Sequence, residues 1–323
     1  MKELLSIHYG IHVDERIIWN GLEGFRYDNF FYFTTPLFHR EIIHMEQSAL
    51  AYYLHENGWP QTAIPIPNNE GNWYTRYREK DYLVFQVEYK SYNHSMPNGE
   101  ALATFHDTGA NYQYEPQMIS SYGQWKHLWA EKLDAFEQRI LTDIGDYPGS
   151  YYRLVHDTLP YLIGISENAI QYMQESEQET RFHKADQGAI AFRRYNGQLH
   201  NNVIMMTDFV YDHPVRDIAE YIRSRFLQEE DPQKEIASFL NDYQKIRSLS
   251  VFSWRVLYAR LIFPAHIYDV IEQGFHEENK ERCNTNLAEL LNQQQRYEKR
   301  LAEFYNIAGT DYERMQIPVL HWL

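Results

Sequence analysis

The sequence has little cysteine, no long apolar run and a shortage of positive charge. The single cysteine, Cys283, lies in a polar helical stretch and cannot form an internal disulfide, which excludes a disulfide scaffold and a zinc ribbon. No apolar run approaches the roughly 20 residues that span a bilayer, and the N-terminal MKELLSIHYG lacks a signal-peptide core. We therefore expect synthesis and retention on the cytosolic side, with no membrane partner.

The charge balance is acidic. Thirty basic residues stand against forty-five acidic ones, which gives a net charge of −15. Such a balance opposes binding to phosphate backbones, so we expect no nucleic-acid partner. No lysine occurs between Lys2 and Lys80, and this gap bears on the chemistry discussed below.

Several catalytic motifs are also absent. The sequence contains no G-x-x-x-x-G-K-[ST] phosphate loop, no G-x-G-x-x-G fingerprint and no G-x-S-x-G elbow. His39 and His44 are five residues apart, about 140° around a helix, and do not share one metal easily. These absences disfavour a P-loop enzyme, a dinucleotide-binding enzyme, a nucleophilic hydrolase and a zinc protease.

The residues that are present predict a folded protein of two lobes. The chain has 323 residues, of which 44% are apolar and 16% aromatic, enough to bury a full core. The 27 tyrosines and 7 tryptophans suit broad, partly wet contact surfaces. The protein is therefore expected to be globular, with a surface able to bind a partner.

The hydrophobic periodicity changes near residue 90. Residues 1–90 predict a small sheet with one helix over Arg40–Asn57, and residues 91–323 predict a helical lobe with an embedded hairpin around Asn196–Gly197. The predicted strands are residues 16–19, 25–35, 73–78 and 82–89, and the predicted later helices are 101–109, 125–141, 159–175, 236–247, 252–273 and 286–305. This order is typical of an α+β, two-lobed, protein-kinase-like fold.

The stretch Thr207–Arg223, TDFVYDHPVRDIAEYIR, carries the clearest chemical pattern. An apolar strand over Val203–Met206 is expected to present Asp208 at its end, and Pro214 suits the first turn of the helix that follows. A strand that brings a carboxylate to a turn is a common way to hold a metal-bound phosphate. This stretch is therefore where the sequence predicts a site.

Asp208-Phe209, Pro214 and Asp217 together resemble the aminoglycoside phosphotransferase and choline kinase superfamily, and the segment Leu102–His106 resembles the start of its helical lobe. Within that superfamily the chain resembles the spore coat protein S-like branch. The resemblance implies that Asp208 binds magnesium and that Asp217 braces the catalytic loop. The alternative is that both are acidic residues at a helix start, stabilised by the helix dipole.

The resemblance also implies a nucleotide site, with ATP and magnesium as the cofactors. Glu46, on the predicted helix, takes the place of the carboxylate that pairs with a strand lysine. Phe85–Tyr89 takes the place of the segment that crosses between lobes, so Gln86 and Glu88 are the expected adenine-side residues. The alternative for Glu46 is a solvated helix residue.

The sequence departs from the pattern of active members at three positions. Their H-x-D-x-x-x-x-N motif corresponds to residues 183–190, where His183 is kept but Ala185 and Ile190 replace the aspartate and asparagine. Asp186 comes one residue late, and only a local bulge would restore its direction. The strand lysine is replaced by residues 33–35, Phe-Thr-Thr, and the nearest cationic substitutes are His39 and Arg40.

Phosphoryl transfer depends on positioning and charge stabilisation, so losing these three groups together favours a different role. The first hypothesis is a kinase-like protein with a degraded catalytic site, a pseudokinase, which the resemblance places in the spore coat after synthesis in the mother cell, with other coat proteins as partners.

The alternative is an active ATP-dependent phosphotransferase on a small hydroxylated metabolite. Asp186, with His183, would then position the acceptor, Asp208 would bind magnesium, and Arg193 or Arg194 would clamp the phosphate. A third hypothesis is a pseudokinase that binds ATP without transfer.

Overall fold

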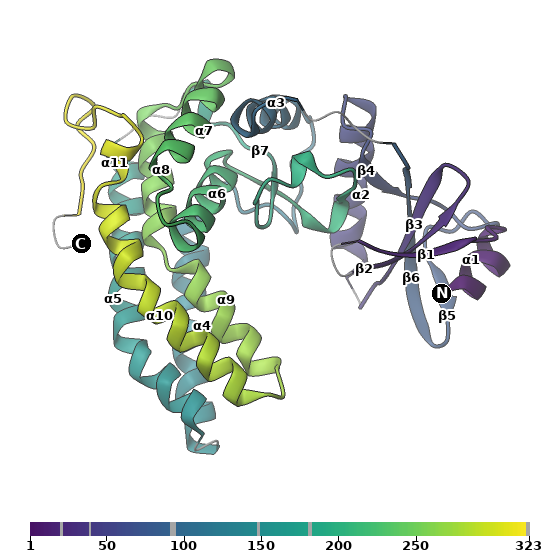
Figure 1. The fold of residues 1–323 in the computed structure, drawn as a ribbon, viewed down its shortest axis with the longest axis horizontal. Helices are drawn as coiled ribbons and strands as arrows, with labels where there is room; N and C mark the ends of the chain where they lie inside the picture. Colours follow the sequence, from purple (N-terminus) through teal and green to yellow (C-terminus); the bar gives the residue numbers. More distant parts are fainter. Residues whose placement is uncertain (20–21, 39, 91–94, 147–148, 180–182, 321–323) are drawn as a thin grey trace. The chain divides into compact units, whose positions relative to one another are not determined.

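The computed structural model describes residues 1–19, 22–38, 40–90, 95–146, 149–179 and 183–320 (Figure 1). Its contacts divide the chain into two compact units. Unit 1 comprises Met1–Ser120 and Gly188–Asp212, and unit 2 comprises Ser121–Gln187 and His213–Leu323. Residues 91–94 lie outside the described part, and the lobe boundary at residues 90 and 91 stays a prediction.

Unit 1 contains a seven-stranded sheet in which β1, β2, β3, β6, β4 and β8 follow one another and β5 pairs with β6. The strands are β1 (Glu15–Trp19), β2 (Leu22–Tyr27), β3 (Phe30–Pro36), β4 (Thr62–Pro65), β5 (Thr75–Tyr77), β6 (Lys80–Glu88) and β8 (Ile204–Met205). The neighbouring strands are antiparallel except β4 and β8, which are parallel. The predicted early strands are confirmed, whereas β4 was not predicted.

Unit 1 also contains the helices α1 (Lys2–Tyr9), α2 (Glu41–Glu56) and α3 (Asn98–Ala110). The helix α1 buries Leu4 and Leu5 in a cluster with Phe25, Tyr32 and Val84, from β2, β3 and β6. Burial of these apolar side chains removes their surface from water and fixes α1 on the sheet. The predicted Arg40–Asn57 helix is confirmed as α2.

A second, two-stranded sheet in unit 1 differs from the predicted hairpin. Strand β7 (Ala189–Phe192) pairs antiparallel with β9 (Phe209–Asp212), not with the apolar segment before Thr207. Gly197 has φ of 90° and begins the 3₁₀ turn η2 (Gln198–His200) instead of closing a two-residue hairpin. The hairpin prediction was wrong because β8 finds its partner in β4, far away in sequence.

The helix α3 packs on this second sheet through aromatic rings. The rings of Phe105 and Phe192 stack with centroids 4.9 Å apart, and Phe209 lies edge-on to Phe192 at 5.6 Å. A Cβ added at Gly109 would lie 2.7 Å from the backbone nitrogen of Ile190, so the close approach of α3 to β7 requires glycine. The segment that carries Asp208 and Asp212 is therefore held rigidly in unit 1.

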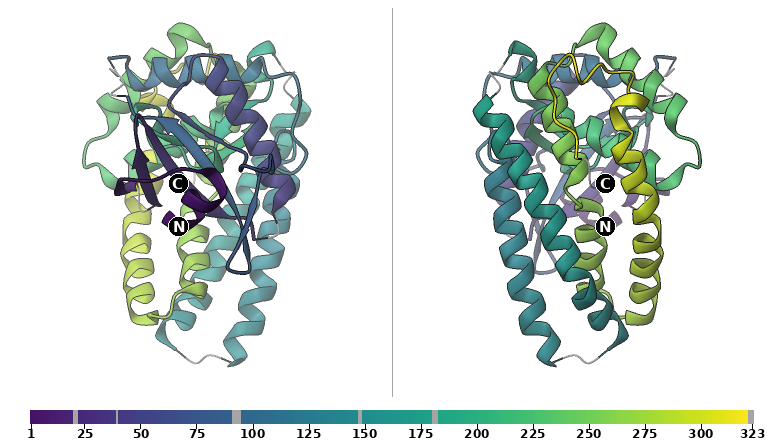
Figure 2. Two further views of the ribbon diagram at one scale, coloured as in Figure 1. Left: turned by 90° about the vertical axis from the view of Figure 1, so that its right-hand side faces the viewer. Right: turned by 90° about the vertical axis from the view of Figure 1, so that its left-hand side faces the viewer.

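Unit 2 is helical. Its helices are α4 (Trp125–Asp146), α5 (Ser150–Glu179), α6 (Val215–Gln228), α7 (Gln233–Ile246), α8 (Val251–Ile262), α9 (Ala265–His276), α10 (Lys280–Ala302) and α11 (Phe304–Ile307). The long helices α4, α5, α9 and α10 run side by side (Figure 2). The single helix predicted over residues 252–273 is wrong, because it is broken at Phe263-Pro264 and proline cannot donate a helical hydrogen bond.

Many tyrosine side chains are buried in the core, whereas the sequence analysis expected them on contact surfaces. Eight of the twelve largest fully buried side chains are tyrosines. Several of their hydroxyls find partners inside the protein, as where Tyr151 donates to the carbonyl of Ile271 at 2.8 Å and Tyr297 to that of Leu261 at 2.7 Å. The abundance of tyrosine is thus in large part a packing feature, and it gives less support to a contact surface than expected.

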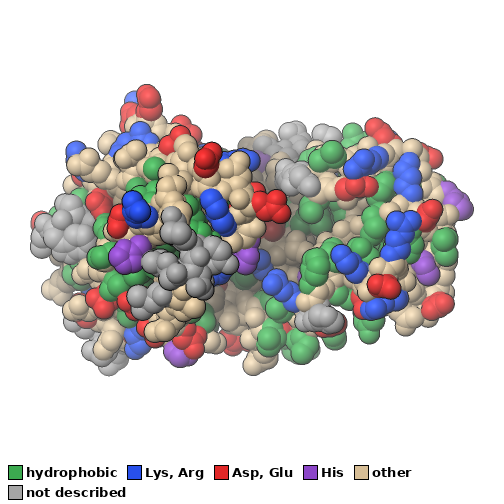
Figure 3. Space-filling view, turned by 90° about the horizontal axis from the view of Figure 1, so that it is seen from below, with side chains coloured by type: hydrophobic (Ala, Val, Ile, Leu, Met, Phe, Trp, Pro, Cys, Tyr) green, Lys and Arg blue, Asp and Glu red, His purple; other side chains and the backbone are tan. Residues whose placement is uncertain are grey.

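No helix in the described part of the chain is long and apolar enough to cross a membrane. On the face drawn in Figure 3, acidic, basic and hydrophobic side chains are interspersed. Several of the exposed hydrophobic side chains of unit 1 surround one pocket.

Candidate functional site

Asp208 does not lie at the end of a strand. It is the last residue of the 3₁₀ turn η3 (Met206–Asp208), which follows β8 and precedes β9. The predicted geometry was wrong because β8 is only two residues long and the chain turns before its next strand begins. A carboxylate at the strand end is instead supplied by Asp212.

Asp208 lines a small pocket within unit 1, of about 140 Å³, together with the polar side chains of Gln198, Asn201 and Thr207. Burial raises the pKa of Asp208, while the positive charge of Arg193 opposes that rise. A half-buried carboxylate with a raised pKa beside other polar groups is able to accept a proton or a cation. Its role as a magnesium ligand stays a prediction.

Asp212 is the residue that the sequence reasoning missed. It ends β9, where it pairs with Ala189 of β7, and it is fully buried. The four preceding residues, Asp208 to Tyr211, are an aspartate followed by apolar residues. This pattern led the sequence analysis to place the strand-end carboxylate at Asp208 instead of Asp212. Only the pairing of Ala189–Phe192 with Phe209–Asp212 shows that Asp212 ends a strand. The order of apolar and polar residues within either strand does not reveal this pairing.

In unit 2, His183 and Asp186 form a cap at the short 3₁₀ turn η1 (Lys184–Asp186). The Nδ1 atom of His183 accepts a hydrogen bond from the Ala185 amide at 3.2 Å, and the His183 amide donates to Oδ2 of Asp186 at 2.6 Å. Two backbone amides are thereby satisfied by two side chains, as in a capping box. This arrangement is complete without any substrate.

The Asp186 carboxylate is fully buried and accepts further hydrogen bonds. Oδ1 accepts from the hydroxyls of Ser250 at 2.6 Å and Ser253 at 2.5 Å, at the start of α8, and lies 3.4 Å from Nε2 of His213. Burial by itself raises the pKa of Asp186, but the hydrogen bonds from His213, Ser250, Ser253 and the His183 amide outweigh it and lower the pKa to about 2. The carboxylate therefore stays ionised and fixes η1 to α8.

The backbone around Asp186 is held as firmly as its side chain. Tyr122 donates to the carbonyl of Asp186 at 2.8 Å, and Arg247 donates to the carbonyl of Ala185 at 3.0 Å. Contacts from three separate parts of unit 2 thus converge on this turn. The local bulge that would have freed Asp186 is replaced by a clamped turn.

Asp217 lies in the first turn of α6 and is fully buried. Its amide donates to the carbonyl of Pro214 at 3.2 Å, which begins the helix. A carboxylate near a helix N-terminus is favoured by the helix dipole. Both the bracing role and the dipole alternative remain compatible with this place, and the brace stays a prediction.

Among the residues that the structure describes, Glu46 pairs with no lysine, and its carboxylate does not point only into solvent. Its two carboxylate oxygens accept hydrogen bonds from three consecutive backbone amides, those of Gln117 at 2.7 Å, Met118 at 2.9 Å and Ile119 at 3.0 Å. Successive amides that converge on one carboxylate form a strong, charge-assisted contact. Glu46 thus joins α2 to the segment after α3, all within unit 1.

Gln86 and Glu88 lie on β6. The backbone of Gln86 pairs with Tyr32 of β3 and Ile64 of β4, so it occupies the middle of the sheet. The carboxylate of Glu88 binds Nζ of Lys90 at 2.6 Å. Contact of either residue with adenine stays a prediction.

The residues present do not fit the full set for a magnesium nucleotide that the resemblance implies. Where that set requires a lysine, β3 carries Phe33, which is buried, followed by two threonines. Among the residues that the structure describes, no three histidine, cysteine, aspartate or glutamate side chains gather to hold a metal. Asp186, which would position the acceptor, is committed to the cap.

Comparisons with known proteins agree with the fold and the resemblance. A family model described as "Spore coat putative kinase YutH" matches residues 2–304. The chain is 30% identical over 336 residues to the endospore coat-associated protein YutH of Bacillus subtilis (strain 168), covering 100% of this chain and 98% of that protein.

Solved structures of similar fold are small-molecule phosphotransferases. An aminoglycoside phosphotransferase from Alicyclobacillus acidocaldarius matches with a TM-score of 0.61 at 14% identity, covering 93% of this chain and 94% of that one. A microcompartment-associated aminopropanol kinase matches with a TM-score of 0.61 at 10% identity, covering 95% and 97%. At these identities the likeness shows the fold alone, an aminoglycoside phosphotransferase-like fold as expected from the sequence.

Proposed function

The chain belongs to the YutH spore coat family, and from that premise we propose that it is a kinase-fold protein that acts in the spore coat by binding and assembly, not by phosphoryl transfer. The observation that carries the proposal is the burial and hydrogen bonding of the Asp186 carboxylate. Its carboxylate is buried and accepts from two serine hydroxyls and a backbone amide. An acceptor-positioning base needs a free lone pair directed at the substrate.

The remaining kinase-like carboxylates support the same proposal. Glu46 is engaged by three backbone amides, and the strand lysine that it would pair with is missing from the sequence. Catalysis of phosphoryl transfer relies on positioned charge, so the loss of the lysine, the asparagine and a free Asp186 removes most of it. The framework of the fold persists, because these carboxylates hold loops.

The test is a titration of the purified protein with ATP and magnesium, followed by the melting temperature and by ATP turnover. We expect neither a shift at millimolar nucleotide nor turnover. A shift of several degrees together with turnover that Asp208→Ala or Asp212→Ala abolishes would overturn the proposal. A shift without turnover, blocked by Gln86→Trp, would identify a nucleotide-binding pseudokinase.

The second candidate is an ATP-dependent phosphotransferase acting on a small hydroxylated metabolite. The observation that favours it is Asp212, a buried carboxylate at the end of β9, in a fold shared with known phosphotransferases. In that case Asp212→Asn abolishes turnover while the protein stays folded. The first candidate instead predicts that the variant changes stability only.

The place of action is proposed from the relative named as endospore coat-associated. A fluorescent fusion of the chain in sporulating cells should collect at the forespore surface and resist extraction with mild buffers. A fusion that stays dispersed through the mother cell until lysis would contradict a coat role.

A further inference from the structure

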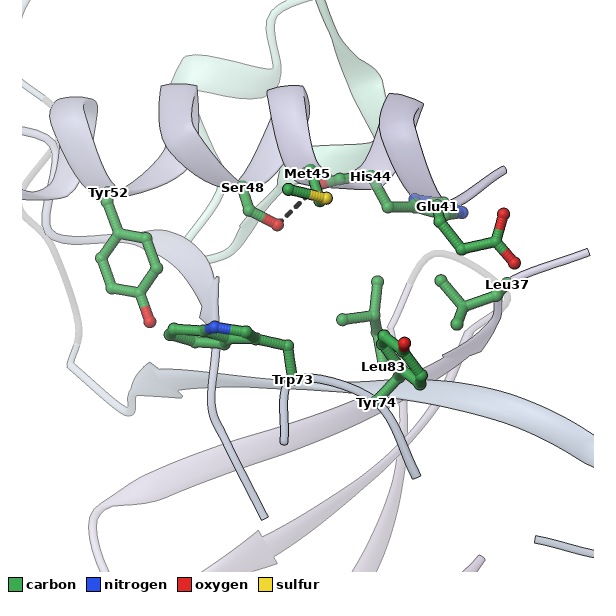
Figure 4. A pocket seen from close by; sticks show the side chains of 9 residues that line it. All are labelled: Leu37, Glu41, His44, Met45, Ser48, Tyr52, Trp73, Tyr74 and Leu83. Atoms are coloured by element: carbon green, nitrogen blue, oxygen red, sulfur yellow. Dashed lines mark hydrogen bonds between the residues drawn. The ribbon is translucent and has the colours of Figure 1, made fainter. Parts of the chain in front are cut away.

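A pocket of about 260 Å³ in unit 1 lies against one face of α2, and Glu46, which contacts residues 117–119, lies at the same level of the helix but on another face. We call it the α2 pocket; it is lined among others by Glu41, His44, Met45, Trp73, Tyr74 and Leu83 (Figure 4). The helix side chains face the strand β6 and the segment before β5 across it. The nucleotide-site candidates Glu46, Gln86, Glu88 and Asp208 do not line it.

The geometry of the α2 pocket is fixed from one end. Tyr52, also on α2, donates its hydroxyl to the carbonyl of Pro65, and its ring lies edge-on to Trp73 with centroids 6.1 Å apart. Glu41, Met45 and Tyr52 recur at helical spacing, so they present one continuous face. Trp73 is thereby positioned before any partner binds, which lowers the entropy lost on binding.

The rim of the pocket exposes large apolar side chains. Met45 is 70% exposed, Trp73 50% and Tyr74 52%. A small molecule filling about 260 Å³ would leave much of this apolar surface in water. Exposed apolar surface gathered around one pocket is typical of a protein-binding site with a central anchor.

The charge of the lining defines which partner is favoured. Glu41 is exposed and forms no ion pair with the described residues, and it is the one acidic residue of the lining. The other titratable group is His44, whose pKa is lowered by burial, and its Nδ1 has no hydrogen-bond partner in the described structure. A positive charge on the partner would therefore meet an unpaired carboxylate.

A second copy of this chain is the disfavoured occupant. Each copy carries a net charge of −15, so self-association would bring like charges together, whereas a basic segment would be attracted. Arg40 neighbours Glu41 in sequence but does not line the pocket. Charge complementarity thus points to a different protein with a basic contact residue.

We propose that the α2 pocket binds a segment of a partner protein that presents one bulky apolar side chain next to a lysine or arginine. The apolar side chain lies between Met45, Trp73 and Leu83, and the basic residue pairs with Glu41. This proposal rests on the binding role proposed above and gives it a surface and a partner chemistry.

The probe is a short capped peptide with leucine followed by arginine, compared with twins that carry glutamate for the arginine or alanine for the leucine. Binding is measured by saturation-transfer NMR without nucleotide. One anchor and one surface ion pair predict a dissociation constant in the millimolar range. We expect Trp73→Ala to weaken binding at least about tenfold, and Glu41→Gln to weaken it about two- to fivefold and only for the arginine peptide.

Two control variants leave the pocket intact. Tyr114→Ala removes an aromatic ring that is 74% exposed elsewhere in unit 1, and Glu56→Gln removes an exposed charge at the far end of α2. Both should bind the peptide as the wild type does. Because Trp73 and Glu41 are exposed, their variants should keep the wild-type melting temperature.

Absence of peptide binding would overturn the proposal. Four further outcomes would do so as well: equal binding of the glutamate peptide, an equal loss of binding in Tyr114→Ala, dimerisation that Trp73→Ala abolishes, or tighter binding of free 4-phenylbutylamine than of the peptide. The result is independent of the nucleotide titration. Peptide binding with ATP turnover would refute the non-catalytic proposal alone, and no peptide binding with no turnover would refute only the α2 pocket.

Discussion

Asp186 in unit 2 lies one residue past the place where the kinase resemblance expects an aspartate, and Glu46 in unit 1 lies at the place of the expected helix carboxylate. The two carboxylates differ in burial. Asp186 is fully buried and joins a turn to the start of α8, whereas Glu46 is partly exposed and joins α2 to three backbone amides. A buried charge is costly unless every lone pair is satisfied, and a partly exposed one retains water as an alternative partner.

The difference shows how strongly the fold depends on each of these two carboxylates. In unit 2 Asp186 belongs to the buried core, so its removal is expected to destabilise the unit strongly. Unit 1 uses Glu46 in a contact that water can partly replace. The comparison predicts a graded series of effects, largest where the carboxylate is most buried.

The largest effect is expected for Asp186→Ala. The substitution leaves the hydroxyls of Ser250 and Ser253 and the ring of His213 without their acceptor in the core. Removing one partner from such a buried charged group costs about 3–5 kcal/mol of unfolding free energy. Urea denaturation followed by circular dichroism measures this loss.

The matched control for that variant is Asp242→Ala. Asp242, on α7, is partly exposed and binds the exposed Lys245 at 2.6 Å, so its loss should cost less than about 1 kcal/mol. If Asp186→Ala unfolded at the same urea concentration as Asp242→Ala, the core role of Asp186 would be refuted.

The next effect concerns pH. The folded pKa of Asp186 is about 2, below the ordinary value of 3.8, so its contribution is fully present above about pH 4 and is lost as the pH falls toward the folded pKa. The difference corresponds to about 2 kcal/mol. Wild type should therefore lose about 2 kcal/mol more than Asp186→Asn between about pH 5 and pH 2. Parallel stability curves for the two proteins would contradict the assigned hydrogen bonds.

A smaller effect is expected for Glu46→Gln. The amide oxygen still accepts from one or two of the backbone amides at residues 117–119, but the charge is lost, at a cost of about 1 kcal/mol. Hydrogen exchange should accelerate at these three amides and not elsewhere in unit 1. Glu56→Gln on the same helix is the control. Unchanged exchange would remove Glu46 from this structural role.

The sequence predicted the local elements of the fold well and their long-range partners poorly. Helix α2 and the strands up to β6 follow alternation and helical spacing, which are local signals. The pairing of β7 with β9 and of β8 with β4 depends on non-local contacts. Asn196–Gly197 carries a strong turn signal, but the strand after it is only two residues long and cannot enforce a hairpin.

The sequence predicted which residue types are present or missing at the candidate site, but not the hydrogen bonds and strand pairing that hold them. The departure at Ala185 and Ile190 and the missing lysine were visible in the sequence. That Asp186 accepts from Ser250 and Ser253 was not, because those serines lie more than sixty positions away and begin a different helix. Asp212 was passed over for the same reason, since only the β7–β9 register places it at a strand end.

The smallest effect, and the opposite in sign, is expected for Asp208→Asn. Burial raises the pKa of Asp208, so ionising it at neutral pH opposes folding, and this penalty fades as the pH falls through the folded pKa. Removing the charge should therefore leave the unfolding free energy at pH 7 unchanged or raise it by less than about 1 kcal/mol. Urea denaturation at neutral pH measures this. If the variant instead loses a stabilisation that magnesium and ATP give to the wild type, Asp208 is a metal ligand, and the two carboxylates, Asp208 and Asp186, differ in role as well as in burial.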